Sequence, residues 1–432
     1  MIQSKELDQN PGSTKLVLDS GIDAVLSEKE TPGQGAEVVL LTRNIKIEGE
    51  AGGVQCGYEH TKQMEYRGTM STMTNGLTCQ AWTDHGYTPE NYPDAGLADG
   101  NYCRNPNGFE RAWCFPNDGS RWQYCDVPMC LGGYLQVLHP PGVPQVIEGV
   151  EFTNMGQQKH RHNTAGGVPQ GGNNRYPVQF LYTGDVPGSS IARNSIRNSQ
   201  HRCISMDGVS NVTIASNVAH DTSGHCYYIG YEATDNVVAN NIGSRTNDLM
   251  WWGEQVSGTN DHDKATFFFR SMENDVIHNT AAGSAGRGFE MDMDWRTRGE
   301  DNAHNANLIG PGGSMRRKPM RIFRGNTAHS NWWQGYRLHH FEQYWNKDAT
   351  PLFEDTRAYR NREHAIYTYS ELRKADVCLS SFLVPMCLDI LSHYHHSLLL
   401  LFLDVIAATW RGGFFSDNQW GLVLREQDDA HV

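Results

Sequence analysis

Three carboxylates alternate with apolar side chains in the segment Phe289-Glu-Met-Asp-Met-Asp-Trp295. Successive side chains of a β-strand point to opposite faces, so Glu290, Asp292 and Asp294 would share one face. Two carboxyl groups can hydrolyse a glycosidic bond when they lie about 5–5.5 Å apart for retention of configuration, or about 6.5–9.5 Å apart for inversion. A ladder of ion pairs and a calcium site are the alternative interpretations of the same acids.

An asparagine repeat indicates the elements that must position these acids. Asparagine recurs at intervals of 23, 24, 38 and 47 residues, at Asn194, Asn217, Asn241, Asn279 and Asn326. The inward-facing positions predicted ten residues further on are Ile204, Tyr227, Trp251, Phe289 and Tyr336. A short strand-turn-strand unit cannot bury its apolar face alone, so neighbouring copies must stack. We therefore predict a mainly β protein, a right-handed parallel β-helix, with loops in the longer intervals and a hydrogen-bonded asparagine ladder at a turn.

This register points the acids away from the core, and the next coil presents Arg337 and His339 at the matching outward positions. We expect Glu290 to lie beside Arg337 and Asp292 beside His339. Crowded carboxylates would raise the pKa of one acid, as a general acid requires, and the basic neighbours would lower the pKa of the others. His225, at the start of another predicted strand, completes the set of candidate catalytic residues.

Cations and aromatic side chains near the acidic strand suggest a carbohydrate ligand. The candidate ligand-binding residues there are Arg316, Arg317, Lys318 and Arg321 in the following loop, and Trp332 and Trp333 before the next strand. Such a loop would attract a polyanion locally, although the net charge of −13 argues against a nucleic-acid binder. Asn260-Asp-His-Asp263 is a possible calcium site, and no other cofactor is indicated.

Six of the ten cysteines lie within 75 residues, which is typical of a disulfide framework in an oxidising compartment. They are Cys56, Cys79, Cys103, Cys114, Cys125 and Cys130. Spacing alone leaves fifteen pairings open. The segments between them, among them Tyr66-Arg-Gly-Thr69, Ala112-Trp-Cys114 and Arg121-Trp-Gln-Tyr-Cys-Asp126, resemble a kringle. The resemblance implies the pairs Cys56–Cys130, Cys79–Cys114 and Cys103–Cys125.

Kringles often bind lysine through two aspartates and an aromatic trough. The trough is represented here by Trp113 and Trp122, with Arg121 available for a carboxylate. Asn107 and Phe109 stand where the family carries its aspartates. The alternative is that this module is a spacer or a protein-binding knob. Glycine pairs flank the module, and the sequence on both sides of it is typical of β-strands. We therefore expect the kringle to be an insertion in one larger fold.

Several segments outside this module share one resemblance: Glu37–Glu48, Val150–Gln158, Arg175–Phe180, Arg202-Cys203 and Gly224-His-Cys226. They resemble the β-helix region of a group that includes the cell-migration-inducing hyaluronan-binding protein, its transmembrane-protein-2 relative and the fibrocystin-like receptors. The resemblance implies an extracellular or cell-surface protein that binds hyaluronan or a related glycosaminoglycan, with hydrolysis of the polymer as a further expectation. The competing hypothesis is a non-enzymatic adhesion or receptor fragment whose kringle binds a protein partner.

The predicted domain boundaries are 1–36 for a truncated N-terminal segment, 37–53 for the start of the β-helix, 54–131 for the kringle, 132–376 for the β-helix, 377–411 for an atypical hydrophobic insertion and 412–432 for a resumed coil and tail. We expect the insertion to pack badly because it lacks the repeat. The first residues lack the features of a secretory signal, and no apolar stretch reaches the roughly 20 residues that span a bilayer.

Three short motifs remain. Cys203 and Cys226 would lie one strand apart, as a disulfide or as two buried thiols, while the states of Cys378 and Cys387 are left open. Thr222-Ser-Gly-His-Cys226 resembles the histidine motif of trypsin-like proteases, but no Gly-Asp-Ser-Gly-Gly follows, which argues against a serine protease. Asn211-Val-Thr213 is a glycosylation sequon on a predicted strand.

Overall fold

A computed structural model describes the side chains of residues 39–58, 61–98, 100–138, 142–157, 175–248, 264–292, 320–339 and 353–367, and elsewhere only the backbone of some strands. Residues 1–40 form a compact unit of their own, in which β1 (Ile2–Leu7) pairs antiparallel with β2 (Thr14–Leu18). No helix within the described part of the chain is long and apolar enough to cross a membrane.

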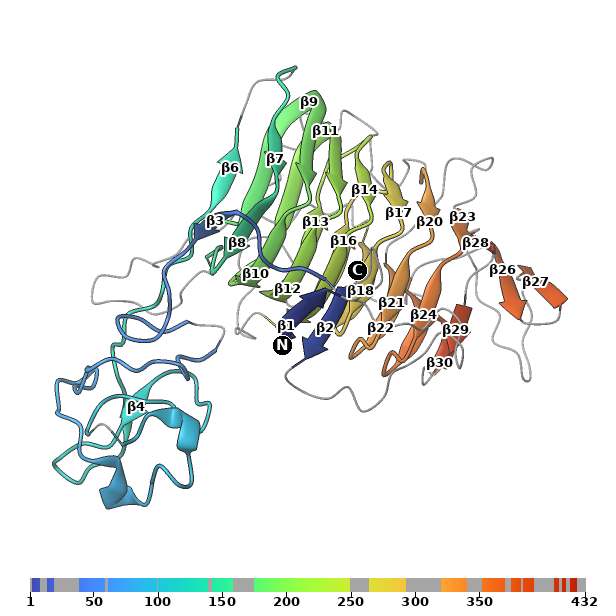
Figure 1. The fold of residues 1–432 in the computed structure, drawn as a ribbon. Helices are drawn as coiled ribbons and strands as arrows, with labels where there is room; N and C mark the ends of the chain where they lie inside the picture. The colour runs from blue at the N-terminus through green and yellow to red at the C-terminus, as the bar shows by residue number, and fades with distance from the viewer. Residues whose placement is uncertain are drawn as a thin grey trace, which may run out of the picture. The chain divides into compact units, whose positions relative to one another are not determined.

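The coils of a β-helix each contribute strands to three parallel sheets (Figure 1). The first sheet joins β7 (Val146–Glu148), the second halves of β9 (Val178–Ala192) and β11 (Ile204–Ala215), β14 (Val237–Ala239), β17 (Asp275–Ile277), β20 (Phe323–Arg324), β23 (Leu352–Glu354) and β28 (Ala408–Arg411). The second sheet joins β3 (Ile45–Glu48), β8 (Val150–Thr153), β10 (Ser195–Ser199), β12 (Val218–Ser223), β15 (Ile242–Asn247), β18 (Thr280–Ala282), β21 (Thr327–His329), β24 (Arg357–Tyr359) and β29 (Phe414–Ser416). The third sheet joins β6 (Leu135–Val137), the first halves of β9 and β11, β13 (Tyr227–Ile229), β16 (Ala265–Phe269), β19 (Arg287–Asp292), β22 (Gln334–His339), β25 (His364–Tyr369) and β30 (Trp420–Arg425). The predicted mainly β fold with a parallel β-helix is confirmed.

The predicted asparagine ladder lies at the turn between the first and second sheets. Its rungs are Asn194, Asn217, Asn241, Asn279 and Asn326, all fully buried. The Nδ2 atom of each rung donates to the Oδ1 atom of the next, at 3.0, 2.9, 3.0 and 3.0 Å. A buried amide needs partners for both its oxygen and its nitrogen, and the stacked column supplies them from one coil to the next. The ladder is therefore confirmed as a structural feature of the turn.

A column of stacked rings fills the core beneath the third sheet. Tyr227, Phe267, Phe289 and Tyr336 follow one another with ring centroids 4.6, 4.7 and 5.0 Å apart. The prediction that Trp251 holds the inward position of the Asn241 coil is wrong, because Phe267 pairs with Tyr227 on one side and Phe289 on the other. The extra residues of that coil are inserted before β16, so counting ten residues from the asparagine fails there.

The longer intervals of the repeat fall at the ends of third-sheet strands. Residues 248–264 connect β15 to β16, residues 293–322 connect β19 to β20, and residues 340–351 connect β22 to β23. The chain therefore varies most in length beside the sheet that carries the acidic strand.

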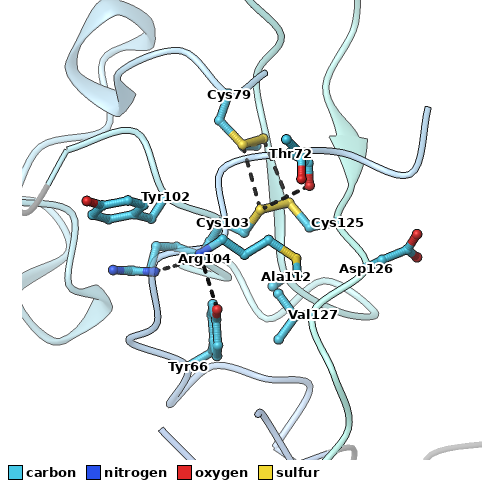
Figure 2. Close-up of a disulfide and its surroundings, with 12 residues drawn as sticks. Tyr66, Thr72, Cys79, Tyr102, Cys103, Arg104, Ala112, Cys125, Asp126 and Val127 are labelled. Atoms are coloured by element: carbon cyan, nitrogen blue, oxygen red, sulfur yellow. Dashed lines mark hydrogen bonds between the residues drawn. A yellow bond between two sulfur atoms is a disulfide. The ribbon is translucent and has the colours of Figure 1, made fainter. Parts of the chain in front are cut away.

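The kringle is held by the three disulfides that the resemblance implied: Cys56–Cys130, Cys79–Cys114 and Cys103–Cys125. Figure 2 shows the last of these, with the Sγ atom of Cys79 3.6 Å from that of Cys103. The bridges surround a compact aromatic core in which the rings of Trp82 and Trp113 meet edge to face at 4.7 Å. The secondary structure consists of the 3₁₀ helices η1 (Trp82–His85) and η2 (Pro93–Ala95) and the paired strands β4 (Trp113–Cys114) and β5 (Gln123–Tyr124).

Two further observations concern the cysteines and the C-terminal region. A disulfide joins Cys203 to Cys226, which decides between the two alternatives that the sequence left open. At the start of the predicted insertion, β26 (Lys374–Ser381) and β27 (Val384–Leu391) pair antiparallel, with Cys378 opposite Cys387. Parallel pairing resumes with β28, where Thr409 pairs with Leu352.

Candidate functional site

The outward face of the third sheet brings the predicted acids and bases into the expected register. Glu290 of β19 pairs with Arg337 of β22, and Asp292 pairs with His339. Phe289 and Met291 point into the core between them. The segment of 47 residues thus contains one coil with inserted chain and no additional rung.

Glu290 lies between two guanidinium groups. Its carboxylate is 2.9 Å from Arg287 and 2.8 Å from Arg337. The side chain is almost fully buried, with 1% of its surface exposed. Hydrogen bonds between charged partners are shorter and stronger than those between neutral groups. The arrangement is that of a buried structural ion pair.

Asp292 lies between a third arginine and a histidine. Its carboxylate oxygens are 3.3 Å from Arg270 and 3.6 Å from His339, and 5% of the residue is exposed. Burial, the largest single influence, would lower the pKa of Arg270, but Asp292 together with Tyr231 and Tyr228 outweighs burial and the pKa is raised. Arg270 is therefore a permanent cation. Neither Arg270 nor Arg287 was predicted from the sequence. Arg270 follows the alternation of β16, two residues after Phe268, whereas Arg287 lies three residues before Glu290 and does not follow the alternation of the acids.

The same cluster is also a potential metal site, because donor atoms of Glu290, Asp292 and His339 all lie within 4.8 Å of one another. Calcium prefers six to eight oxygen ligands. Here the carboxylates already pair with arginines, so the residues fit a calcium ion poorly. The predicted calcium segment, residues 260–263, lies outside the described residues.

Aromatic rings and cations extend the outward face toward the N-terminal coils. The guanidinium of Arg202 lies 4.7 Å from the ring centroid of Tyr176 and 3.5 Å from that of Tyr228. The imidazole of His225 packs on Phe268 at 3.9 Å, and its Nδ1 accepts the backbone N–H of Ala265 at 3.1 Å. His225 is fully buried, so the structure places this candidate catalytic residue among packing groups.

A more accessible cluster lies where the chain enters β22. Trp332 is 56% exposed, and the guanidinium of Arg362 from the next coil lies 3.7 Å from its ring centroid. The adjacent ring of Trp333 lies 4.5 Å from the Nζ atom of Lys264 and 5.0 Å from the guanidinium of Arg287. The two predicted tryptophans thus join the exposed surface to the buried ion pairs. Arg362 and Lys264 were not predicted, because they come from neighbouring coils far away in the sequence.

Several predicted site residues lie elsewhere. Asp294, Arg316, Arg317 and Lys318 fall outside the described residues. Arg321 is described, and it pairs with Asp235 at 2.6 Å and with Asp275 at 3.1 Å along the first sheet. These two carboxylates neutralise the charge that Arg321 would offer to an anionic ligand.

In the kringle, the phenyl ring of Phe109 occupies the aromatic trough. It stacks on Trp113 at 5.3 Å and meets Trp122 at 5.1 Å. Trp113 is only 1% exposed, whereas Arg121 is exposed and lies 5.8 Å from the ring centroid of Trp122. Because Phe109 stands at one of the family's aspartate positions, it removes an anion and also covers the ring on which the stem of a lysine would lie.

Comparisons with known proteins match the two parts of the fold separately. A family model described as the CEMIP beta-helix matches residues 131–336, and a kringle domain model matches residues 58–130. Plasminogen of Capra hircus is 39% identical over 111 residues, which cover 22% of this chain and 89% of that sequence. The putative apolipoprotein(a)-like protein 2 of Homo sapiens is 44% identical over 77 residues, which cover 16% of this chain and 58% of that protein.

Proposed function

Because this chain joins a kringle domain to a β-helix domain of the CEMIP family, we propose that it is an extracellular protein that binds hyaluronan on the outward face of its third sheet. The observation that carries the proposal is the exposed ring of Trp332 beside the exposed guanidinium of Arg362. A tryptophan ring stacks on the apolar face of a sugar, and a guanidinium pairs with a carboxylate. Hyaluronan carries both groups in its repeating unit.

The buried ion pairs support binding in preference to cleavage. Glu290 and Asp292 are each held between basic side chains, which fixes the positions of Arg287 and of the adjacent Trp333. In this role the acids stiffen the surface that meets the polymer. The disulfides of the kringle support an extracellular location, since such frameworks persist in oxidising compartments.

The binding proposal is tested with the purified full chain on immobilised high-molecular-weight hyaluronan. We expect Trp332→Ala to raise Kd about tenfold or more, as removal of an aromatic anchor does. Arg362→Gln should weaken binding and reduce its dependence on salt concentration. Arg193→Gln is the matched control, because Arg193 is an exposed cation paired with Glu148 on a different sheet. A folded chain that does not bind hyaluronan would overturn the proposal.

Hydrolysis by a retaining mechanism is the second candidate. It is favoured by the closeness of Glu290 and Asp292, whose donor oxygens lie within 4.8 Å of each other, near the separation of about 5–5.5 Å that retention requires. The test is the size of hyaluronan on a gel after incubation, with and without calcium. We expect unchanged polymer. Shortening that Asp292→Asn abolishes, in a variant with unaltered circular dichroism, would make the protein a hydrolase.

A further inference from the structure

The sequon Asn211-Val-Thr213 lies at a bend in the middle of β11. It is the only Asn-X-Ser/Thr tripeptide in the chain. The pairing of β11 with β9 shifts register between Ser210 and Val212, so Asn211 is skipped in the pairing of these two strands. Its φ angle of 62° lies in the left-handed region, which asparagine tolerates better than most residues. The bend marks the corner between the third and first sheets.

Side chains alternate along this segment, which places Asn211 and Thr213, the two residues that define the sequon, on the solvent side. Asn211 and Thr213 are both exposed, while Val212 between them is 1% exposed and points into the core. The Nδ2 atom of Asn211 donates to the Oδ1 atom of Asp185 at 2.6 Å, and Asp185 is also exposed. An amide nitrogen has two hydrogens, so a substituent can replace one while the other keeps this hydrogen bond.

We propose that Asn211 carries an N-linked glycan. The donor is a lipid-pyrophosphate-linked oligosaccharide of the secretory pathway. A bond forms between Nδ2 and C1 of the first sugar, the bond from C1 to the pyrophosphate oxygen breaks, and the lipid pyrophosphate leaves while Nδ2 gives up one proton. Passage through this compartment agrees with the four disulfides of the described residues, which form under the same oxidising conditions.

A related triplet in the kringle offers an internal contrast. Asn101-Tyr-Cys103 has cysteine in place of threonine, but Cys103 is bonded to Cys125. The Nδ2 atom of Asn101 donates to the carbonyl oxygen of Cys79 at 2.8 Å, and the side chain is half-buried. The side-chain amide of Asn101 is therefore part of the hydrogen bonding that holds the kringle together. The chain should therefore carry a single N-linked glycan.

The test is to express the full chain in human cells behind an added leader peptide and digest the product with peptide-N-glycosidase F in ¹⁸O water. We expect one discrete increase in gel mobility, with Asn211 converted to ¹⁸O-labelled aspartate in the mass spectrum. Asn211→Gln and Thr213→Ala should each abolish the shift. Thr213→Ser, which preserves the hydroxyl of the sequon, should retain it.

The proposal is overturned if the peptide containing Asn211 is found unmodified in chains whose Cys203–Cys226 bridge has formed, since that bridge reports arrival in the oxidising lumen. If the chain is retained inside the cells, the intracellular pool is digested with endoglycosidase H, which should produce one gel shift and leave a single N-acetylglucosamine on Asn211 in the mass spectrum. Neither result depends on whether the protein binds hyaluronan.

Discussion

The kringle and the β-helix hold their buried groups in place by different means. In the kringle, three covalent links join residues 22, 35 and 74 positions apart around one aromatic core. The β-helix also has a bridge between neighbouring coils, Cys203–Cys226, but there the same type of contact recurs from coil to coil, amide on amide and ring on ring. A cross-link stabilises mainly by restricting the unfolded chain, whereas a repeated contact stabilises each coil against its neighbours. The two regions should therefore respond differently to the loss of a single interaction.

The largest loss of stability is expected in the β-helix, at the ion pairs of Glu290. Glu290→Ala would remove the buried carboxylate that Arg287 and Arg337 both contact. Removal of one partner from a buried ion pair costs about 3–5 kcal/mol. Chemical denaturation of the full chain, followed by near-ultraviolet circular dichroism, measures the loss.

A triple variant provides the control for that experiment. Replacing Glu290, Arg287 and Arg337 together by apolar residues of similar volume should recover most of the lost stability, because the carboxylate and the two guanidinium groups that contact it are then removed together. If the single variant is as stable as the parent, Glu290 is not the centre of a buried ion pair.

The next effect concerns the kringle alone. Cys103→Ser combined with Cys125→Ser removes the bridge at the centre of its core, and loss of such a bridge typically costs about 2–5 kcal/mol. We expect the kringle to lose its fold while the thermal transition of the β-helix is unchanged. Differential scanning calorimetry follows both transitions in one experiment. A coupled loss of the two would contradict the independence of the two regions.

A smaller effect is expected from the loss of one rung of the asparagine ladder. Asn241→Ala removes the acceptor used by both the backbone N–H and the Nδ2 atom of Asn217, and each unsatisfied buried group costs about 1–3 kcal/mol. The Oδ1 atom of Asn279 loses one donor but keeps the backbone N–H of residue 241. Hydrogen exchange should reveal faster opening of β12, β15 and β18, the strands that flank this turn. Exchange that accelerates equally in all coils would show that the ladder acts as one cooperative unit.

The smallest effect is a dependence on pH that belongs to the β-helix. Burial lowers the pKa of His220 below its usual value of 6.5, and its Nδ1 lies 2.8 Å from the Oγ atom of Ser244. The unfolded chain therefore takes up a proton more readily, so stability is lost as the pH falls below about 6.5. His220→Gln should reduce this loss in melting curves recorded at pH 7.5 and pH 5. The part that remains is expected from His364, whose pKa burial also lowers.

Periodic features were predictable from the sequence, and features that depend on inserted chain were not. The recurrence of asparagine before each predicted strand placed Asn194 next to Asn217 in the ladder, and alternation along the strands placed Glu290 beside Arg337. Trp251 was misassigned because the insertion before β16 moves the strand along the chain, and spacing carries no signal of where an insertion begins.

The burial of the outward face of the third sheet could also not be predicted from the sequence. An acidic strand with basic neighbours has the same pattern whether solvent or side chains cover it. The packing of Trp333 on Lys264 and Arg287 joins three coils, and no local pattern connects them. In the kringle, the fold was predictable from the cysteines and tryptophans. That the ring of Phe109 stacks on Trp113 and fills the trough was not, because it depends on the position of the ring in space.

The Cys56–Cys130 bridge has a mechanical consequence. The Cα atoms of these two residues are 5.0 Å apart, although 74 positions separate them in the chain. If the protein is pulled from its two ends, tension passes through the sulfur–sulfur bond and bypasses everything between the two cysteines. The kringle is then a side loop that bears no load, and stretching the protein would extend only the chain outside it. Under reducing conditions the same force would act on the kringle, and the residues between Cys56 and Cys130 would add to the length of the extended chain.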